Sequence, residues 1–324
     1  MRTNFLYNSC GSFMIVLLMG IAVFYTGCDN PPEENPEIIG DSSWYDKNSP
    51  EQQQYLLKTY QGRGDINSVI AWPPDHLRRI VDISVDVTGS GFTRESLYQG
   101  RRMPLAEHNL RKLLDEYLVN ELKPGDKIML RIYGSMPGGE NVNVDEKASL
   151  EFPADKIEVD VRNPSRKNGQ VQIIVKKIDH ADVGQRKQLI EQILNWFIEF
   201  IRQAERANGR FEASPLFQFI RNVCSQHSAA KETPKLLIFV TDGHFKVGDL
   251  YYDPSTYRQR SHSIDRIRTI ITNSRLKPFT EPTDKTKLVL FGLYSDGDEG
   301  FKQAQEDIFR WYFSPQPVEL LTNR

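Results

Sequence analysis

Short apolar runs alternate with longer amphipathic segments from Pro74 to the end of the chain. The apolar runs predict strands at residues 79–86, 127–133, 235–240 and 287–293. Segments whose apolar residues recur at steps of three and four predict helices at residues 105–122, 183–207, 215–227, 264–274 and 301–313. Strands that alternate with helices predict an α/β fold, with a doubly wound (Rossmann-like), mostly parallel sheet and helices on both faces.

The stretch between the second predicted strand and the long helix is less regular. Strand-like segments occur at residues 150–152, 156–161 and 171–178, and the turn-forming pair Asn168-Gly169 separates the last two. We interpret the first segment as the third strand of the sheet. The other two are interpreted as a β-hairpin inserted at one edge of that sheet.

The N-terminal 27 residues carry a single charge, on Arg2, and residues 13–25 are all apolar or Gly. A membrane-spanning helix needs about 20 apolar residues, so this shorter run favours an export signal. It ends in Tyr25-Thr26-Gly27-Cys28, which resembles the lipobox of bacterial lipoproteins. The resemblance implies cleavage before Cys28 and lipidation of its thiol. The alternative is an uncleaved anchor over residues 11–27, and both interpretations place the protein beside a membrane of the bacterial cell envelope.

We therefore expect three parts: a lipoprotein signal peptide at 1–27, a tether or linker at 28–74, and one domain at 75–324. The start of the linker contains Pro31, Pro32 and Pro36, which disfavour a helix. The rest of the linker is polar, and its pattern is compatible with a short helix near residues 50–60.

Composition narrows the class of protein further. A formal net charge of −2 gives no general affinity for polyphosphates, so we expect no nucleic-acid partner. Hydrophobic residues make up 39% of the chain, enough for a sizeable core. Cys10 and Cys28 lie in or at the export segment, which leaves Cys224 as the only thiol of the domain and excludes a disulfide scaffold. We expect Cys224 to be buried.

Oxygen-bearing side chains follow two of the predicted strands. The first strand leads into Asp86-Val87-Thr88-Gly89-Ser90, and the strand at 235–240 leads into Thr241-Asp242-Gly243. In a doubly wound sheet of order 3-2-1-4-5 these two strands are neighbours, and a crevice opens at their carboxyl ends. Carboxylates and hydroxyls without His or Cys ligands suit a hard cation such as Mg²⁺.

At these residues the sequence resembles the von Willebrand factor A (VWA) domain family. Asp86, Thr88 and Ser90 match the family's Asp-x-Ser-x-Ser motif with Thr in place of the first Ser, and Asp242 matches its fourth-strand aspartate. Ser214, before Pro215, takes the place of the family's threonine. The resemblance implies a metal-ion-dependent adhesion site for Mg²⁺, or Mn²⁺ or Ca²⁺. A protein partner's Glu or Asp would complete the ion's shell, without catalysis or a small-molecule substrate.

Each feature has an alternative interpretation. Both motifs also occur simply as helix caps or turns, and the fold could be a metal-free scaffold. A Mg²⁺-dependent phosphohydrolase of the dehalogenase type needs Asp-x-Asp-x-Thr, but Ser84 stands two positions before Asp86. Asp82 is expected on the same strand face as Asp86 but away from the site. His244 is interpreted as a polar neighbour or a solvent-exposed residue and not as a catalytic base.

Overall fold

A computed structural model describes residues 37–40, 54, 58–59, 66–72, 78–87, 94–133, 149–162, 172–181, 183–206, 216–228, 232–247, 250–258, 264–294 and 297–322. The expected signal peptide at residues 1–27 and the expected lipidation site Cys28 lie outside these residues and stay predictions.

Six strands form the central sheet, in the order β14-β13-β10-β3-β6-β7. Their bounds are Val318–Thr322 (β14), Thr286–Leu293 (β13), Lys235–Val240 (β10), Ile80–Asp86 (β3), Lys127–Tyr133 (β6) and Ser149–Glu151 (β7). All neighbouring strands are parallel except β6 and β7, which are antiparallel. Counted along the chain, this is the 3-2-1-4-5-6 order of a doubly wound sheet. The predicted fold class is confirmed.

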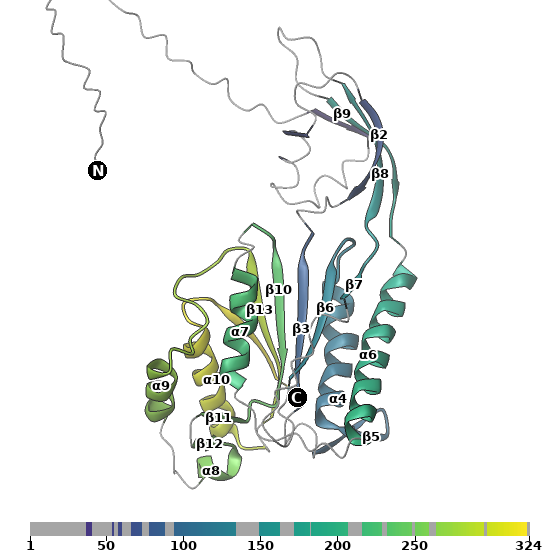
Figure 1. Cartoon of the computed structure of the whole chain (residues 1–324). Helices are drawn as coiled ribbons and strands as arrows, with labels where there is room; N and C mark the ends of the chain where they lie inside the picture. The colour runs from purple at the N-terminus through teal and green to yellow at the C-terminus, as the bar shows by residue number, and fades with distance from the viewer. Residues whose placement is uncertain are drawn as a thin grey trace, which may run out of the picture.

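Two sets of helices cover the opposite faces of this sheet (Figure 1). One face carries α4 (Leu105–Lys112), which continues through a π-helical segment (Leu113–Leu118) into α5 (Val119–Glu121), together with α6 (Val183–Arg206). The other face carries α7 (Leu216–Ser228), α9 (Ile264–Asn273) and α10 (Glu299–Phe313). Each predicted helix is present, and the first differs from the prediction only in its π-helical middle.

The strand β10 shows why the sequence folds this way. Its side chains alternate between the two faces, and all six residues are buried. Ile238 belongs to the core under α4 and α6, whereas Leu237 and Phe239 belong to the core under α7, α9 and α10. A strand buried on both faces needs a continuous apolar run, which is the pattern of residues 235–240.

A separate four-stranded sheet has the order β1-β9-β8-β2. The predicted hairpin is present as β8 (Asp155–Arg162) and β9 (Gln172–Asp179), which pair antiparallel with each other. It does not extend the central sheet, because its outer edges pair with β1 (Glu37–Gly40) and β2 (Ile66–Trp72). Both of these strands come from the stretch that we expected to be a linker, so part of that stretch is built into a sheet.

Two small hairpins lie where β3 and β10 end, and the four-stranded sheet lies at the opposite end of these strands (Figure 1). The first hairpin is β4 (Glu95–Tyr98) and β5 (Arg101–Pro104). The second is β11 (Phe245–Val247) and β12 (Leu250–Tyr252), which leads into the short helix α8 (Pro254–Arg258). Among the described residues, no helix has the length and apolar character needed to cross a membrane.

Candidate metal site

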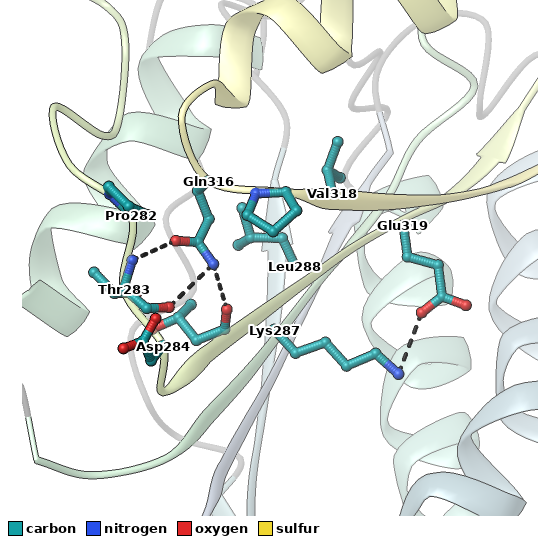
Figure 2. A pocket seen from close by; sticks show the side chains of 10 residues that line it. Pro282, Thr283, Asp284, Lys287, Leu288, Gln316, Val318 and Glu319 are labelled. Atoms are coloured by element: carbon teal, nitrogen blue, oxygen red, sulfur yellow. Dashed lines mark hydrogen bonds and ion pairs between the residues drawn. The ribbon is translucent and has the colours of Figure 1, made fainter.

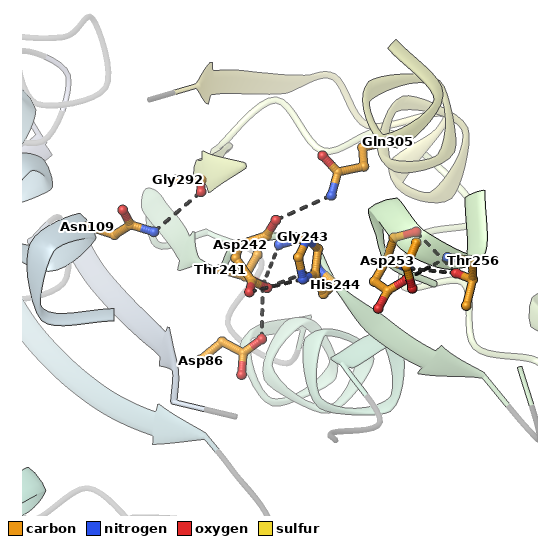
Figure 3. Close-up of polar contacts among 11 residues, drawn as sticks. Asp86, Asn109, Thr241, Asp242, Gly243, His244, Asp253, Thr256, Gly292 and Gln305 are labelled. Atoms are coloured by element: carbon orange, nitrogen blue, oxygen red, sulfur yellow. Dashed lines mark hydrogen bonds and ion pairs between the residues drawn. The ribbon is translucent and has the colours of Figure 1, made fainter. Parts of the chain in front are cut away.

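The two strands that lead into the oxygen-bearing motifs are neighbours, as predicted. β3 and β10 pair in parallel with Val85 opposite Val240, so Asp86 and Thr241 emerge at the same edge. The Thr241 hydroxyl donates a hydrogen bond to Asp86 Oδ2 over 2.9 Å (Figure 3). Asp86 is 6% exposed and Asp242 is 4% exposed. The carboxyl edge of the sheet therefore holds two buried carboxylates, and one of them, Asp86, accepts a hydrogen bond from Thr241.

A tight turn fixes the Asp242 carboxylate. Its Oδ1 accepts a hydrogen bond from the backbone N–H of His244 at 2.9 Å, and the backbone N–H of Gly243 donates to Thr241 Oγ1 at 3.1 Å. The Asp242 carbonyl accepts hydrogen bonds from the N–H of Tyr294 and from Gln305 Nε2. These last two bonds connect the turn to the end of β13 and to α10.

Gly243 is required by this turn for two reasons. Its φ of +77° lies in the left-handed region that side chains disfavour. A Cβ at this position would meet Leu293 Cδ2 at 2.6 Å and Gln305 Nε2 at 2.7 Å. The turn that contains Asp242 therefore requires glycine at position 243.

His244 is buried directly beside Asp242. Its Nδ1 lies 3.4 Å from Asp242 Oδ2, and its side chain is 2% exposed. Neither ring nitrogen makes a hydrogen bond. The rings of Phe301 and Tyr294 lie edge-on to the imidazole, at centroid distances of 5.9 Å and 6.4 Å. Of the two expectations for this residue, a polar neighbour of the site is confirmed, and solvent exposure is wrong because these aromatic rings cover it.

Further charged and aromatic groups form the rim of the site. Burial raises the pKa of Tyr251 on β12, and the carboxylates of Asp242 and Asp253 raise it further, while the guanidinium of Arg94 opposes them. Arg94 itself lies over the ring of Tyr294, 5.1 Å from its centroid. The strand β12 and Asp253, which follows it, thus contribute to this rim.

The structure tests only part of the predicted ligand set. It places Asp86 and Asp242 together, whereas Thr88, Ser90 and Ser214 lie outside the described residues. It adds the hydroxyl of Thr241, which the motif Thr241-Asp242-Gly243 already contained, and the imidazole of His244. In the described part of the chain, no three His, Cys, Asp or Glu side chains form a group that could hold an ion. Two carboxylates with the neighbouring Thr241 hydroxyl nevertheless have the oxygen chemistry that Mg²⁺ prefers.

A second buried polar group lies deeper on the same face of β3. Asp82 Oδ2 is 2.7 Å from both Arg131 Nε and His227 Nε2, and Asp82 Oδ1 accepts a hydrogen bond from Ser84 Oγ at 3.2 Å. We call these four residues the Asp82 cluster. Because its carboxylate is paired with groups of the chain itself, the cluster is a structural feature of the interior and not part of the site.

A groove of about 540 Å³ lies at the other end of the sheet, where β13 and β14 begin (Figure 2). The Gln316 amide spans it, accepting from the Thr283 N–H at 2.6 Å and donating to the Thr286 carbonyl at 2.6 Å. Lys287 Nζ lies 3.2 Å from Glu319 Oε2. Since these polar groups already bind one another, we assign no ligand to this groove.

Comparison with known proteins identifies no family for this chain. No family model and no curated protein matches it. Among solved structures, the crystal structure of the manganese-loaded Plasmodium vivax TRAP protein matches with 9% sequence identity, covering 80% of this chain and 72% of that chain, at a TM-score of 0.29. A similarity this low assigns no function, so what the chain does has to be argued from its own residues.

Proposed function

We propose that this chain is a non-enzymatic, membrane-tethered interaction module that binds an acidic group of a protein partner through a divalent cation. Asp86 and Asp242 would supply the charged ligands. The predicted hydroxyl ligands Thr88, Ser90 and Ser214 would supply neutral oxygens. The function and its ligand set follow the VWA resemblance of these five residues, and the tether follows the export segment and Cys28.

One observation carries the proposal: two buried carboxylates meet at the carboxyl edge of neighbouring strands, where doubly wound sheets bind their ligands. Thr241 links them, since its hydroxyl contacts Asp86 and its backbone precedes Asp242. The two carboxylates bring negative charge to one edge of the sheet, and a divalent cation is attracted to such a place. The cation would neutralise this charge and still offer an open position for a partner's carboxylate.

The phosphohydrolase alternative receives less support. Ser84, which stands where that mechanism needs a carboxylate, is 2% exposed and donates its hydroxyl to Asp82. It belongs to the Asp82 cluster. The described residues around Asp86 and Asp242 therefore offer no second acid positioned beside Asp86 along β3, and we favour binding over catalysis. A metal-free scaffold remains the alternative that experiment must separate.

Affinity capture from envelope extracts tests the proposal. The wild-type full chain should retain a partner in Mg²⁺ and release it in EDTA, and Asp242→Ala should retain none while keeping its melting temperature within a few degrees. Asp265→Ala is the matched control, because that carboxylate is 91% exposed on α9. Equal retention by Asp242→Ala and wild type, or retention unaffected by EDTA, would contradict the cation-bridged mode.

The tether is tested separately. A radiolabelled fatty acid fed to expressing bacteria should be incorporated into the wild type and not into Cys28→Ala. Labelling of the variant at the wild-type level would rule out Cys28 as the lipidation site.

A further inference from the structure

The hairpin of β4 and β5 is positively charged and carries an exposed hydrophobic side chain. Residues 94–104 contain three arginines and one glutamate, a net charge of +2, in a chain whose formal net charge is −2. Leu97 is 65% exposed, and the other large hydrophobic side chain exposed in the described part of the chain is Val69 on β2. A single exposed hydrophobic residue is ordinary, so the argument depends on what surrounds Leu97.

The pairing of the two strands gathers three side chains on one face of the hairpin. Leu97 lies opposite Arg102, and side chains along a strand alternate, so Glu95 shares their face. Arg102 Nη1 is 3.9 Å from Glu95 Oε2, and the Arg102 side chain is 81% exposed. An ion pair this long and this exposed contributes little, so Arg102 remains available to a carboxylate from outside the chain.

The hairpin is held firmly by its turn and by its inner face. Gln99 and Gly100 have φ values of +50° and +79°, as in the two-residue turns that close tight hairpins. Next to this turn, the Tyr98 hydroxyl donates a hydrogen bond to Asp115 Oδ2 at 2.7 Å, and the Tyr98 ring lies edge-on to His108. A surface fixed in this way loses little conformational freedom when a partner binds.

The base of the hairpin adjoins the carboxyl edge of the sheet. The Arg94 guanidinium lies 5.1 Å from the ring centroid of Tyr294, whose backbone N–H donates to the Asp242 carbonyl at 3.0 Å. The Arg94 carbonyl accepts the N–H of Leu105 at 2.8 Å, which connects the hairpin to the start of α4. A partner that reaches Asp242 would therefore meet the hairpin as well.

We propose that the outward face of the β4–β5 hairpin is an interaction surface for an acidic segment of a protein partner that also carries an apolar side chain. Arg102 pairs with a carboxylate of that segment, because a guanidinium matches a carboxylate with two parallel hydrogen bonds. Leu97 packs against the apolar side chain. This inference rests on the proposed function for the acidic nature of the partner, and adds a contact that needs no cation.

An anionic membrane would also attract positive charge, but the position of the hairpin favours a protein. Of the described strands, β1 is nearest in sequence to the proposed lipidation site Cys28. It belongs to the four-stranded sheet, which lies at the opposite end of β3 and β10 from the hairpin (Figure 1). The hairpin is therefore at the end of the domain away from the proposed tether.

Fluorescence anisotropy with a labelled peptide of Glu-Leu-Glu-Gly repeats tests the surface. The full chain should bind this peptide in EDTA, and should not bind the charge-reversed peptide of Lys-Leu-Lys-Gly repeats. Arg102→Glu should weaken the binding at least about tenfold, because it places like charges opposite each other. Leu97→Ser should weaken it about threefold or more, through loss of apolar burial.

Each variant has a matched control. Arg310 Nη2 lies 3.7 Å from Glu306 Oε2 with its side chain 56% exposed, so it resembles Arg102, but it is in the last turn of α10. Val69→Ser is the control for Leu97→Ser. Arg310→Glu and Val69→Ser should bind the acidic peptide as the wild type does. Losses in the controls equal to those in the hairpin variants would overturn the proposal.

The remaining outcomes separate this inference from the proposed function. No binding of the acidic peptide to the wild type, or undiminished binding to Arg102→Glu, would overturn the role of the hairpin. Co-sedimentation with phosphatidylglycerol vesicles that Arg102→Glu abolishes, without peptide binding, would assign the hairpin to a membrane instead. Strengthening of peptide binding by Mg²⁺ that Asp242→Ala removes would bear on the cation site alone. Its absence, with the effect of Arg102→Glu intact, would count against the cation bridge and leave the hairpin surface standing.

Discussion

Two buried histidines lie beside aspartates on the same side of the central sheet, and they are built differently. His227 on α7 has its Nε2 2.7 Å from Asp82, whose carboxylate also binds Arg131. His244, after β10, lies 3.4 Å from Asp242 with neither ring nitrogen hydrogen-bonded. The first pair is an internal, satisfied contact. The second leaves both ring nitrogens without a hydrogen bond, at the edge where doubly wound sheets bind their ligands.

This difference separates polar residues that hold the fold from those that can serve a ligand. In the Asp82 cluster, the chain supplies both the negative charge and the groups that balance it. At the carboxyl edge, aromatic rings hold the His244 imidazole in place, but neither of its nitrogens makes a hydrogen bond. Burial alone therefore does not distinguish the two kinds of site, whereas hydrogen-bond satisfaction does.

Replacing each aspartate with alanine should give the largest difference in stability between the two histidine–aspartate pairs. Asp82→Ala leaves the Arg131 guanidinium and the His227 imidazole buried without their shared partner, and we expect a loss of about 3–5 kcal/mol in the free energy of unfolding. Asp242→Ala removes a hydrogen bond to the His244 N–H and should cost about 1 kcal/mol without added metal. Urea unfolding in EDTA measures both. Equal losses of stability in the two variants would show that Asp82 and Asp242 hold the fold to the same degree, and would contradict the comparison.

The histidines themselves give a smaller but sharper test. His227→Phe removes a partner of a buried carboxylate, and the expected loss is about 1–3 kcal/mol. His244→Phe replaces an unsatisfied imidazole by an apolar ring among Phe301 and Tyr294, so the metal-free protein should be unchanged or up to about 1 kcal/mol more stable. The same urea experiment measures both variants. A marked loss of stability in His244→Phe would mean that its imidazole has a structural role.

Cys224 should show the smallest effect, as a probe of the satisfied cluster. It lies one turn before His227 on α7, and burial, with a contribution from the Asp82 charge, raises the pKa of its thiol above the ordinary value. Because the thiolate is the reactive form, Cys224 should react with iodoacetamide far more slowly in the native protein than in urea. Mass spectrometry of the Cys224 peptide follows the rate. Native labelling as fast as that of a free thiol would contradict this description of the interior.

The central sheet could be predicted from sequence because its signals are local. The run at 235–240 is apolar throughout and became β10 with the predicted bounds, and the periodic helix at 183–207 became α6 (Val183–Arg206). The first strand, expected at 79–86, became β3 (Ile80–Asp86). Strand ends in a doubly wound sheet meet by topology, so the proximity of Asp86 and Asp242 followed as well.

Other elements could not be predicted because their stability comes from distant partners. β2 has an exposed Val69 and belongs to a polar stretch, and it is a strand because it pairs with β8 about 90 residues later in the chain. The strand β14 follows two prolines, Pro315 and Pro317, and shows no longer pattern of its own. The burial of His244 depends on Phe301, for which the sequence around the site gives no signal.

Calorimetric titration of a divalent cation into the full chain, alongside Asp86→Ala, tests the central claim most directly. We expect saturable binding of Mg²⁺ and Mn²⁺ at one site per chain in the wild type, and no binding in the variant, whose melting temperature in EDTA should stay within a few degrees of the wild-type value. Binding that persists unchanged in Asp86→Ala, or no binding to the wild type, would contradict a cation site between β3 and β10.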